Sequence, residues 1–347
     1  MARAQLDTDV LVVGGGPIGL AAAIEARLAG LRVMVLESRT GEIDKACGEG
    51  LMPGAVAALE RLGVHPAGIP FEGIRYCGRA IAVEHRFRSG TGLGVRRTTL
   101  HAALSGRAAE LGVERRIARV KAISQDAETV AAGGIQARWL LGCDGLHSAT
   151  RDLAGLAITG PRSRSHRFGL RQHFQIAPWS EFVEVYWGPH AEVYITPVAP
   201  QLVGIAVLGP RGTSYVSALD EVPAIRQRLA GGKPAGPVMG AGPLLQRTRA
   251  RVAGRVLLVG DASGYVDAIT GEGIRVGLEQ ARAAIQAVRH ETPHAYERSW
   301  ASATRDYRVL THGLVRAANH RTLRPLIVPA AHRVPAVFGQ IVERLAR

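Results

Sequence analysis

The chain has 347 residues, 47% of them hydrophobic, and a formal net charge of +14. It can bury a large core, as one large domain or two interleaved ones. The charge does not indicate a nucleic-acid partner, because the only lysines are Lys45, Lys121 and Lys233 and the arginines form no dense basic run. No apolar run reaches the roughly 18 residues of a membrane span. Residues 1–8 lack the apolar core of a signal peptide, so we expect a cytoplasmic protein.

The first predicted elements are a strand, a tight turn and a helix around residues 14–19, which read Gly-Gly-Gly-Pro-Ile-Gly. Apolar runs precede and follow these residues, which is the context that a dinucleotide-binding fingerprint requires. Gly14 would allow the tight turn, Gly16 would let the backbone approach a pyrophosphate, and Gly19 would let the helix pack closely on the strand. The helix N-terminus would then direct its unpaired amides at the phosphates.

A second predicted strand, residues 32–36, ends at Glu37. A carboxylate at this place can accept hydrogen bonds from both ribose hydroxyls, and it argues against a 2′-phosphate on the nucleotide. The glycine-rich segment 40–50 follows. It is too loose for a core and too specific for a linker, so we expect a functional loop.

The middle of the chain is predicted to alternate between helices and strands. Helices are expected over residues 53–62 and 98–111, a short β-meander over 114–130, and a buried strand over 137–141. Between residues 168 and 208 the hydrophobic period changes to two, which is typical of an antiparallel sheet. Its expected strands, at residues 168–176, 181–187, 191–197 and 202–208, would form the layer that faces the substrate. A helical stretch is expected over residues 216–230.

A late motif indicates which nucleotide is bound. Residues 255–259 read as a buried strand that runs into Gly260-Asp261. An aspartate there can hold a ribitol hydroxyl, a group that FAD has and NAD lacks. Gly271 and Gly273 would begin the next helix, whose amides would face the electron-rich N1/O2 edge of a flavin.

The last part of the chain is predicted to be helical, over residues 273–290 and 293–318. A basic, proline-punctuated tail follows, which we interpret as a solvated helical cap, with a membrane-surface element as the alternative. Cys143 is expected in the core and Cys77 has no chemical neighbour in the sequence. The three cysteines lack metal-ligand spacing, so no metal site is expected.

These motifs resemble those of the flavoprotein monooxygenases of the aromatic-hydroxylase type and of the related geranylgeranyl reductases, over nearly the whole chain. Residues 143–151 carry the family's Asp-Gly motif, which is implicated there in holding FAD and NAD(P)H. Arg97 matches the arginine that opens the family's third helix and contacts the flavin nucleotide. Residues 45–51 and 271–274 resemble motifs of the reductase branch. Residues 193–197 stand where reductases and halogenases carry a tryptophan-rich strand, which argues against halogenation and counts against the reductase.

The resemblance implies a glutathione-reductase-like, doubly wound α/β fold with a Rossmann-type FAD-binding domain, an interleaved antiparallel β substrate domain and C-terminal helices. We expect FAD-binding parts at residues 1–75, 96–160 and 246–290, substrate-domain parts at 76–95 and 161–245, and a helical cap at 291–347. No second glycine fingerprint is present, because residues 240–243 lack the final glycine and a preceding strand. NAD(P)H would therefore bind transiently in the flavin groove, or a separate flavin reductase would deliver the electrons.

The expected site residues come from the motifs and from the resemblance. Cys47 and His173 are candidates for catalysis, and Tyr186 and Tyr194 for substrate contact, but each has an ordinary structural alternative in a loop or strand. The expected cofactor-binding residues are Gly14, Gly16, Pro17, Ile18, Gly19, Glu37, Ser38, Arg39, Cys47, Gly48, Arg97, Asp144, Gly145, Gly260, Asp261, Gly271, Gly273 and Ile274.

The function that the resemblance implies is an FAD-dependent monooxygenase that uses NAD(P)H and O2 to hydroxylate an aromatic or polyketide-like small molecule of secondary metabolism. The alternative is a geranylgeranyl-reductase-like enzyme that reduces a C=C bond of an isoprenoid or another alkene, with Cys47 near the reacting carbon. A flavin-binding module without turnover is a third hypothesis.

Overall fold

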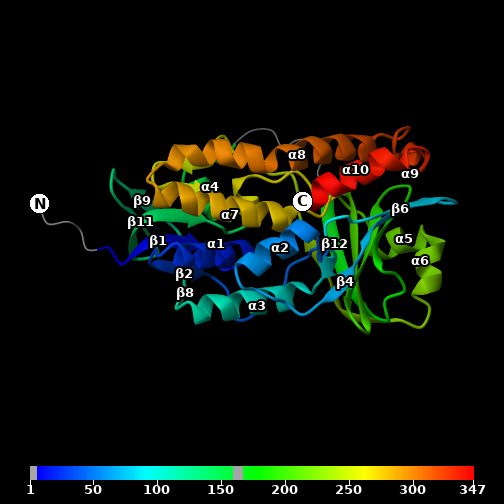
Figure 1. The fold of residues 1–347 in the computed structure, drawn as a ribbon, viewed down its shortest axis with the longest axis horizontal. Helices are drawn as coiled ribbons and strands as arrows, with labels where there is room; N and C mark the ends of the chain where they lie inside the picture. Colours follow the sequence, from blue (N-terminus) through cyan, green and yellow to red (C-terminus); the bar gives the residue numbers. More distant parts are fainter. Residues whose placement is uncertain (1–5, 159–166) are drawn as a thin grey trace, which may run out of the picture.

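The computed structural model describes residues 6–158 and 167–347, which form two large sheets at opposite ends of an elongated molecule (Figure 1). A parallel sheet carries the N-terminal motif, and a mainly antiparallel sheet lies at the other end. Helix α8 (Pro293–Asn319) extends along both ends. The predicted fold class, a Rossmann-type sheet with a separate antiparallel sheet, is confirmed.

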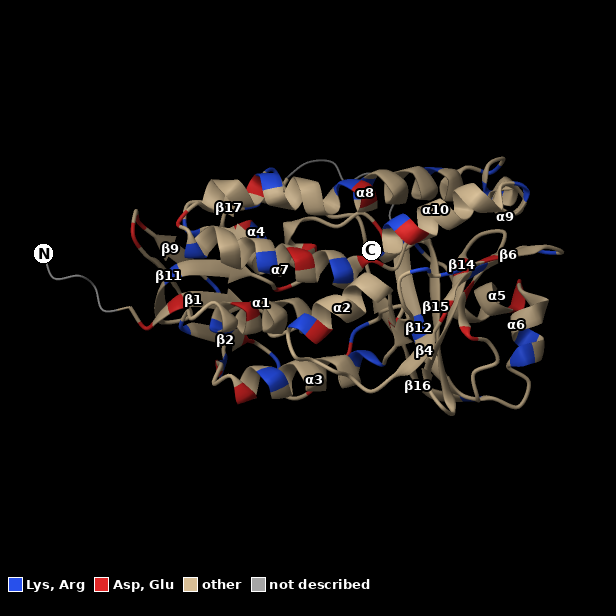
Figure 2. Cartoon of the chain, in the orientation of Figure 1, with Lys and Arg blue, Asp and Glu red and all other residues tan. Residues whose placement is uncertain are grey.

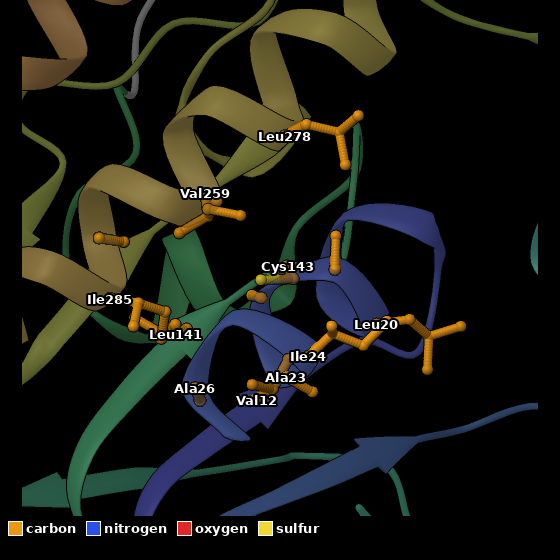
Figure 3. Close-up of a cluster of buried hydrophobic side chains, with 14 of the residues drawn as sticks. Val12, Leu20, Ala23, Ile24, Ala26, Leu141, Cys143, Val259, Leu278 and Ile285 are labelled. Carbon is orange, nitrogen blue, oxygen red and sulfur yellow. The ribbon is translucent and has the colours of Figure 1, made fainter. Parts of the chain in front are cut away.

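The parallel sheet is built around the predicted strand, turn and helix. Its strands have the order β17-β18-β11-β1-β2-β8, and all neighbours are parallel except β17 and β18. Helices α1, α3 and α7 pack on one face. Figure 3 shows side chains of β1, α1, β11 and α7 meeting there, among them Val12, Ile24, Leu141 and Ile285. The elements are β1 (Thr8–Val13), α1 (Pro17–Leu28), β2 (Val33–Glu37), α3 (Arg97–Glu110), β8 (Glu114–Ile117), β9 (Ile123–Gln125), β10 (Val130–Ala132), β11 (Ile135–Gly142), α4 (Ala149–Leu153), β17 (Val252–Ala253), β18 (Val256–Leu258), the 3-10 turn η1 (Gly260–Ser263) and α7 (Gly273–Arg289).

The second sheet, which we call the substrate sheet, has the order β16-β12-β15-β14-β13-β5-β6. The four strands that the period of two predicts are present as β12 to β15. Strand β5, which comes from an earlier part of the chain, pairs with β13 in parallel. The elements are β5 (Gly73–Cys77), β6 (Ala82–Arg86), β12 (Arg167–Gln175), β13 (Phe182–Trp187), β14 (Glu192–Ala199), β15 (Leu202–Pro210) and β16 (Lys233–Ala241).

Two local predictions were wrong in detail. The expected helix over residues 216–230 is two short helices, α5 (Tyr215–Asp220) and α6 (Pro223–Arg228), because a proline cannot donate the hydrogen bond that would continue a helix. The expected meander over residues 114–130 is only half present. Strand β8 pairs in parallel with β2 at the sheet edge, whereas β9 and β10 form the antiparallel pair.

Smaller elements connect the two sheets. Strands β3 (Gly50–Leu51), β7 (Gly92–Gly94) and β4 (Ile69–Phe71) form a three-stranded sheet beside β14. It packs tightly, since a Cβ on Gly94 would lie 1.7 Å from the Pro197 carbonyl oxygen. The remaining elements are α2 (Pro53–Arg61), the 3-10 turn η2 (Arg324–Leu326), α9 (Ile327–Arg333) and α10 (Pro335–Ala346). None of the helices within residues 6–158 and 167–347 has the length and apolar character needed to cross a bilayer.

Candidate functional site: a flavin-sized cavity with two ends

A cavity of about 430 Å³ lies between the two sheets. We call the part beside the parallel sheet the nucleotide end and the part beside the substrate sheet the apolar end. The nucleotide end is lined by residues from the glycine fingerprint, Glu37, Asp144 and the late glycine motif. The apolar end is lined by Phe71, Ile74, Val183, Val185, Tyr194, Ala206, Leu208, Leu244, Ile269, Val342 and Leu345.

The glycines of the fingerprint are required for different structural reasons. A Cβ on Gly14, whose φ is +107°, would lie 2.6 Å from the Cys143 carbonyl oxygen, and one on Gly19 would lie 1.8 Å from the Gly14 carbonyl oxygen. Both are therefore required by the packing of the turn itself. A Cβ on Gly16 would meet no atom within 4 Å. Because Gly16 lines the cavity, the open space beside it fits a pyrophosphate.

Glu37 is held firmly at the end of β2. Its Oε2 accepts from the Gly15 amide at 2.8 Å, and its Oε1 accepts from the Ser38 and Arg39 amides at 2.8 and 3.0 Å. Burial alone would raise the pKa of Glu37, but these amides and the Arg39 charge hold it below its ordinary value. The group therefore remains an anionic acceptor at the nucleotide end, as a ribose partner requires.

Asp144 of the Asp-Gly motif lines the cavity and also bonds to the start of α4, whose N-cap is Ser148. Its Oδ1 accepts from Ser148 Oγ and its Oδ2 from the Thr150 amide at 2.9 Å. Asp144 thus supports the first turn of α4 without being its N-cap. Gly145, with φ of +80°, follows it and turns the chain away beside Lys45.

Two further features fit a bound flavin nucleotide. Arg97 lines the cavity and its Nε is buried without a hydrogen-bond partner among the described residues. A buried guanidinium nitrogen of this kind is suited to a ligand oxygen. Helix α7 begins at Gly273 without a side-chain cap, so its first amides are available to the cavity. The residues present therefore fit FAD.

A buried network that the sequence did not indicate joins the flavin loop, residues 44–50, to the substrate sheet. His173 Nε2 lies 2.7 Å from Glu49 Oε2, and Arg171 Nη1 lies 3.1 Å from His173 Nδ1. Arg171 also pairs with Asp44. Glu49 Oε1 accepts from the Arg97 amide at 2.9 Å, so one carboxylate holds both β12 and the start of α3.

Glu49 is unusual in its backbone. Its φ is +60°, in the left-handed region that a residue with a Cβ seldom adopts. The residue is only 3% exposed. The hydrogen bonds of the network therefore stabilise the strained turn at Glu49. This turn places Cys47 and Gly48 at the cavity wall.

The four candidates for catalysis or substrate contact lie in different places. Cys47 lines the cavity, and its Sγ accepts from the Glu49 amide at 3.4 Å. Tyr194 also lines the cavity and donates to the Ile269 carbonyl at 2.9 Å. His173 is bonded at both ring nitrogens within the network and is not among the lining residues. Tyr186 lies on the opposite face of the substrate sheet, bonded to Glu184 at 2.9 Å.

Comparisons with known proteins agree with this geometry. A family model described as "FAD binding domain" matches residues 7–215. The menaquinone reductase of Mycolicibacterium smegmatis is 30% identical over 86% of this chain and 80% of its own length. The rifampicin monooxygenase of Streptomyces venezuelae is 33% identical over 45% of this chain, which corresponds to 36% of that protein. The chain thus spans only about a third of that monooxygenase's length.

A solved structure supports the fold independently of close sequence similarity. The anhydrotetracycline hydroxylase of Streptomyces rimosus superposes with a TM-score of 0.76 at 22% identity, covering 98% of this chain and 75% of that one. At this identity the likeness shows the fold alone. Together with the family match over residues 7–215, it confirms the prediction from the two glycine motifs: the chain belongs to the FAD binding domain family of flavoproteins.

Proposed function

We propose that the protein is an NAD(P)H-dependent flavin monooxygenase that hydroxylates an aromatic or polyketide-like small molecule. The observation that carries this proposal is the continuity of one cavity, in which an apolar end opens onto residues that fit FAD. The net reaction joins substrate, O2, NAD(P)H and a proton to give hydroxylated substrate, NAD(P)⁺ and water. Relatives that support it include a rifampicin monooxygenase and an anhydrotetracycline monooxygenase.

The chain's own residues would divide the work between the two ends. Bound FAD would supply the redox chemistry, accepting two electrons from NAD(P)H and activating dioxygen. The open backbone at Gly16 and the Arg97 guanidinium would hold the phosphates, and Glu37 would accept from the ribose. The amides that open α7 at Gly273 would stabilise negative charge at the flavin N1/O2 edge. We propose that the three FAD-binding parts, the two substrate-domain parts and the helical cap expected from the sequence correspond to this division of work.

The apolar end would orient the substrate and exclude water. The side chains named above for this end carry no charge. The hydroxyl of Tyr194, which is one of them, already donates to the Ile269 carbonyl. A dry pocket of this kind favours an aromatic ring over a charged ligand. We assign His173 and Glu49 to positioning the flavin loop rather than to proton transfer with substrate.

Two observations favour a second candidate, a reductase of a C=C bond. The match to the menaquinone reductase spans 86% of this chain, more than the monooxygenase matches do, and Cys47 lines the cavity beside the flavin loop. In that case the substrate would be an isoprenoid or another alkene, and O2 would be excluded.

The test is oxygen incorporation by the purified, FAD-loaded protein with NADPH and a panel of phenols and tetracycline-like polyketides. We expect one O2 consumed per hydroxylated product, with labelled oxygen in that product. Cys47→Ser should retain most turnover, as should the control Cys77→Ala, whose thiol lies on the far face of the substrate sheet. Anaerobic reduction of an alkene that is lost in Cys47→Ser but kept in Cys77→Ala would establish the reductase instead.

A further inference from the structure

A second cavity, of about 320 Å³, lies behind the flavin site. Its walls come from residues 245–251, the η1 turn and helices α7 and α8. Gly260, Asp261, Tyr265 and Gly273 line both cavities, so the late glycine motif is the partition between them. Nothing in the proposed monooxygenase reaction uses this second cavity.

The second cavity is lined by four basic side chains from two segments, namely Arg247, Arg251, Arg308 and His312. Figure 2 shows basic residues spaced along α8, which supplies two of them. Trp300 fixes two of the guanidinium groups, because Arg251 Cζ lies 3.6 Å and Arg308 Cζ 5.3 Å from the centroid of its ring. Two cations thus contact the same indole.

Arg247, Arg308 and His312 are exposed and Arg251 is half-buried, and protein carboxylates neutralise little of this charge. Among residues 6–158 and 167–347, no carboxylate forms an ion pair with Arg247, Arg308 or His312, and Arg251 has one, at 3.7 Å from Glu297. Glu297 already accepts from two backbone amides. The other carboxylate at the cavity is Asp261, in the partition.

Two further observations indicate that the cavity suits an anionic ligand. Arg251 Nε is buried and has no hydrogen-bond partner in the described part of the chain. Burial, together with the charges of Arg308 and Arg247, lowers the pKa of His312 below its ordinary value. Like charges that face one cavity without counter-ions disfavour one another until an anion enters.

We propose that this second cavity binds a phosphorylated anion through Arg247, Arg251 and Arg308. Guanidinium groups present planar forks of N–H donors that match phosphate oxygens, and the cavity has room for a diphosphate. The indole of Trp300 is covered by Arg251, so it is not free to stack on a base. The recognised chemistry is therefore the phosphate itself, carried by free diphosphate or by a dinucleotide such as NADP⁺.

The test is calorimetric titration of the FAD-loaded protein with inorganic pyrophosphate and, separately, with NADP⁺, at fixed ionic strength. We expect Arg308→Gln to weaken pyrophosphate binding about tenfold or more, because a charge-assisted contact is lost. The matched control is Arg305→Gln, which removes the same charge from the same helix but does not line the cavity. The flavin absorbance of both variants should match the wild type, which separates this site from the flavin site.

Pyrophosphate and NADP⁺ together show whether the bound phosphate belongs to a free anion or to a nicotinamide nucleotide. Loss of both pyrophosphate and NADP⁺ binding in Arg308→Gln assigns the cavity to the phosphates of the nicotinamide nucleotide. Loss of pyrophosphate binding alone assigns it to a free anion. No pyrophosphate binding by the wild type, or equal weakening in Arg305→Gln, would overturn the proposal.

Discussion

The two ends of the main cavity are formed by different kinds of chemical groups. The nucleotide end consists of backbone amides and glycines, together with Arg97 and the carboxylates of Glu37, Asp144 and Asp261, all from short motifs. The apolar end consists of side chains from β4, β5, β13, β14, β15 and α10, which are far apart in the sequence. The first end recognises a constant ligand through fixed backbone geometry, whereas the second can change its ligand by exchanging side chains on a rigid sheet.

The largest expected effect concerns the backbone geometry of the nucleotide end. Gly16→Val should lower FAD affinity by about 4 kcal/mol, roughly a thousandfold, because its side chain would fill the open space beside the turn. The apoprotein should still fold, since no described atom lies within 4 Å of a Cβ there. Flavin retention and thermal unfolding measure the two effects. Gly14→Val is the contrast, because its Cβ meets the Cys143 backbone and the variant should fail to fold.

The next effect concerns the network between the ends. Glu49→Ala should destabilise the fold by about 3 kcal/mol, since it leaves the buried His173 without its carboxylate and leaves the buried Arg171 with Asp44 alone. It should also loosen the flavin loop and increase FAD dissociation. Urea unfolding measures the first and flavin release the second. Glu110→Ala, which removes an exposed partner of Arg107, should change stability by less than about 1 kcal/mol, and an equal loss there would remove the network's special role.

A pH effect of intermediate size is expected at Glu272, beside the late glycine motif. Burial raises its pKa to about 7 from an ordinary 4.5, although Arg275, at 2.6 Å, opposes the shift. Between these values the folded state binds a proton that the unfolded state does not. This contribution to stability is therefore complete below pH 4.5 and is lost as the pH rises to about 7.

Glu272→Gln should remove this pH dependence, whose total over the window is about 3 kcal/mol. Urea unfolding at pH 4.5 to 8 measures it, with Glu279→Gln, an exposed partner of the same arginine, as the control. A slope that survives in Glu272→Gln would contradict the assignment.

The smallest effect compares two tyrosines on opposite faces of the substrate sheet. Tyr194→Phe should weaken binding of an uncharged apolar probe such as N-phenyl-1-naphthylamine by about 1 kcal/mol, because the Ile269 carbonyl loses its donor beside the cavity. Tyr186→Phe should leave probe binding unchanged, since its hydroxyl bonds Glu184 on the other face. Equal effects of the two substitutions on fluorescence titrations would mean that the apolar end is not the ligand-binding face.

The strand, turn and helix at the nucleotide end could be predicted from the sequence because their signals are local. A glycine that must adopt a positive φ, or that touches a neighbouring backbone, leaves a mark at its own position, as Gly14 does. The four strands β12 to β15 of the substrate sheet were also predicted, because alternation shows which face is buried, whereas β5 and β6 were not. Strand β16 was missed, since its sequence Lys-Pro-Ala-Gly-Pro-Val-Met-Gly-Ala is exposed and has no alternation.

The network around Glu49 could not be predicted in the same way. Glu49 and His173 are 124 positions apart, and no periodic pattern relates them. Two weak signals were present: a carboxylate inside a glycine-rich loop, and Arg171 with His173 at alternate positions of a strand, which places both on one face. A pairing of this kind depends on how two sheets meet, which is a property of the tertiary structure.

The left-handed backbone at Glu49 has a consequence for protein engineering. A glycine would relieve about 1 kcal/mol of backbone strain at this position, and asparagine would relieve part of it. That gain is smaller than the loss of about 3 kcal/mol expected when the carboxylate that joins β12, α3 and the flavin loop is removed. Libraries that aim to stabilise this flavoprotein should therefore keep residue 49 fixed and screen for retained flavin colour as well as for melting temperature.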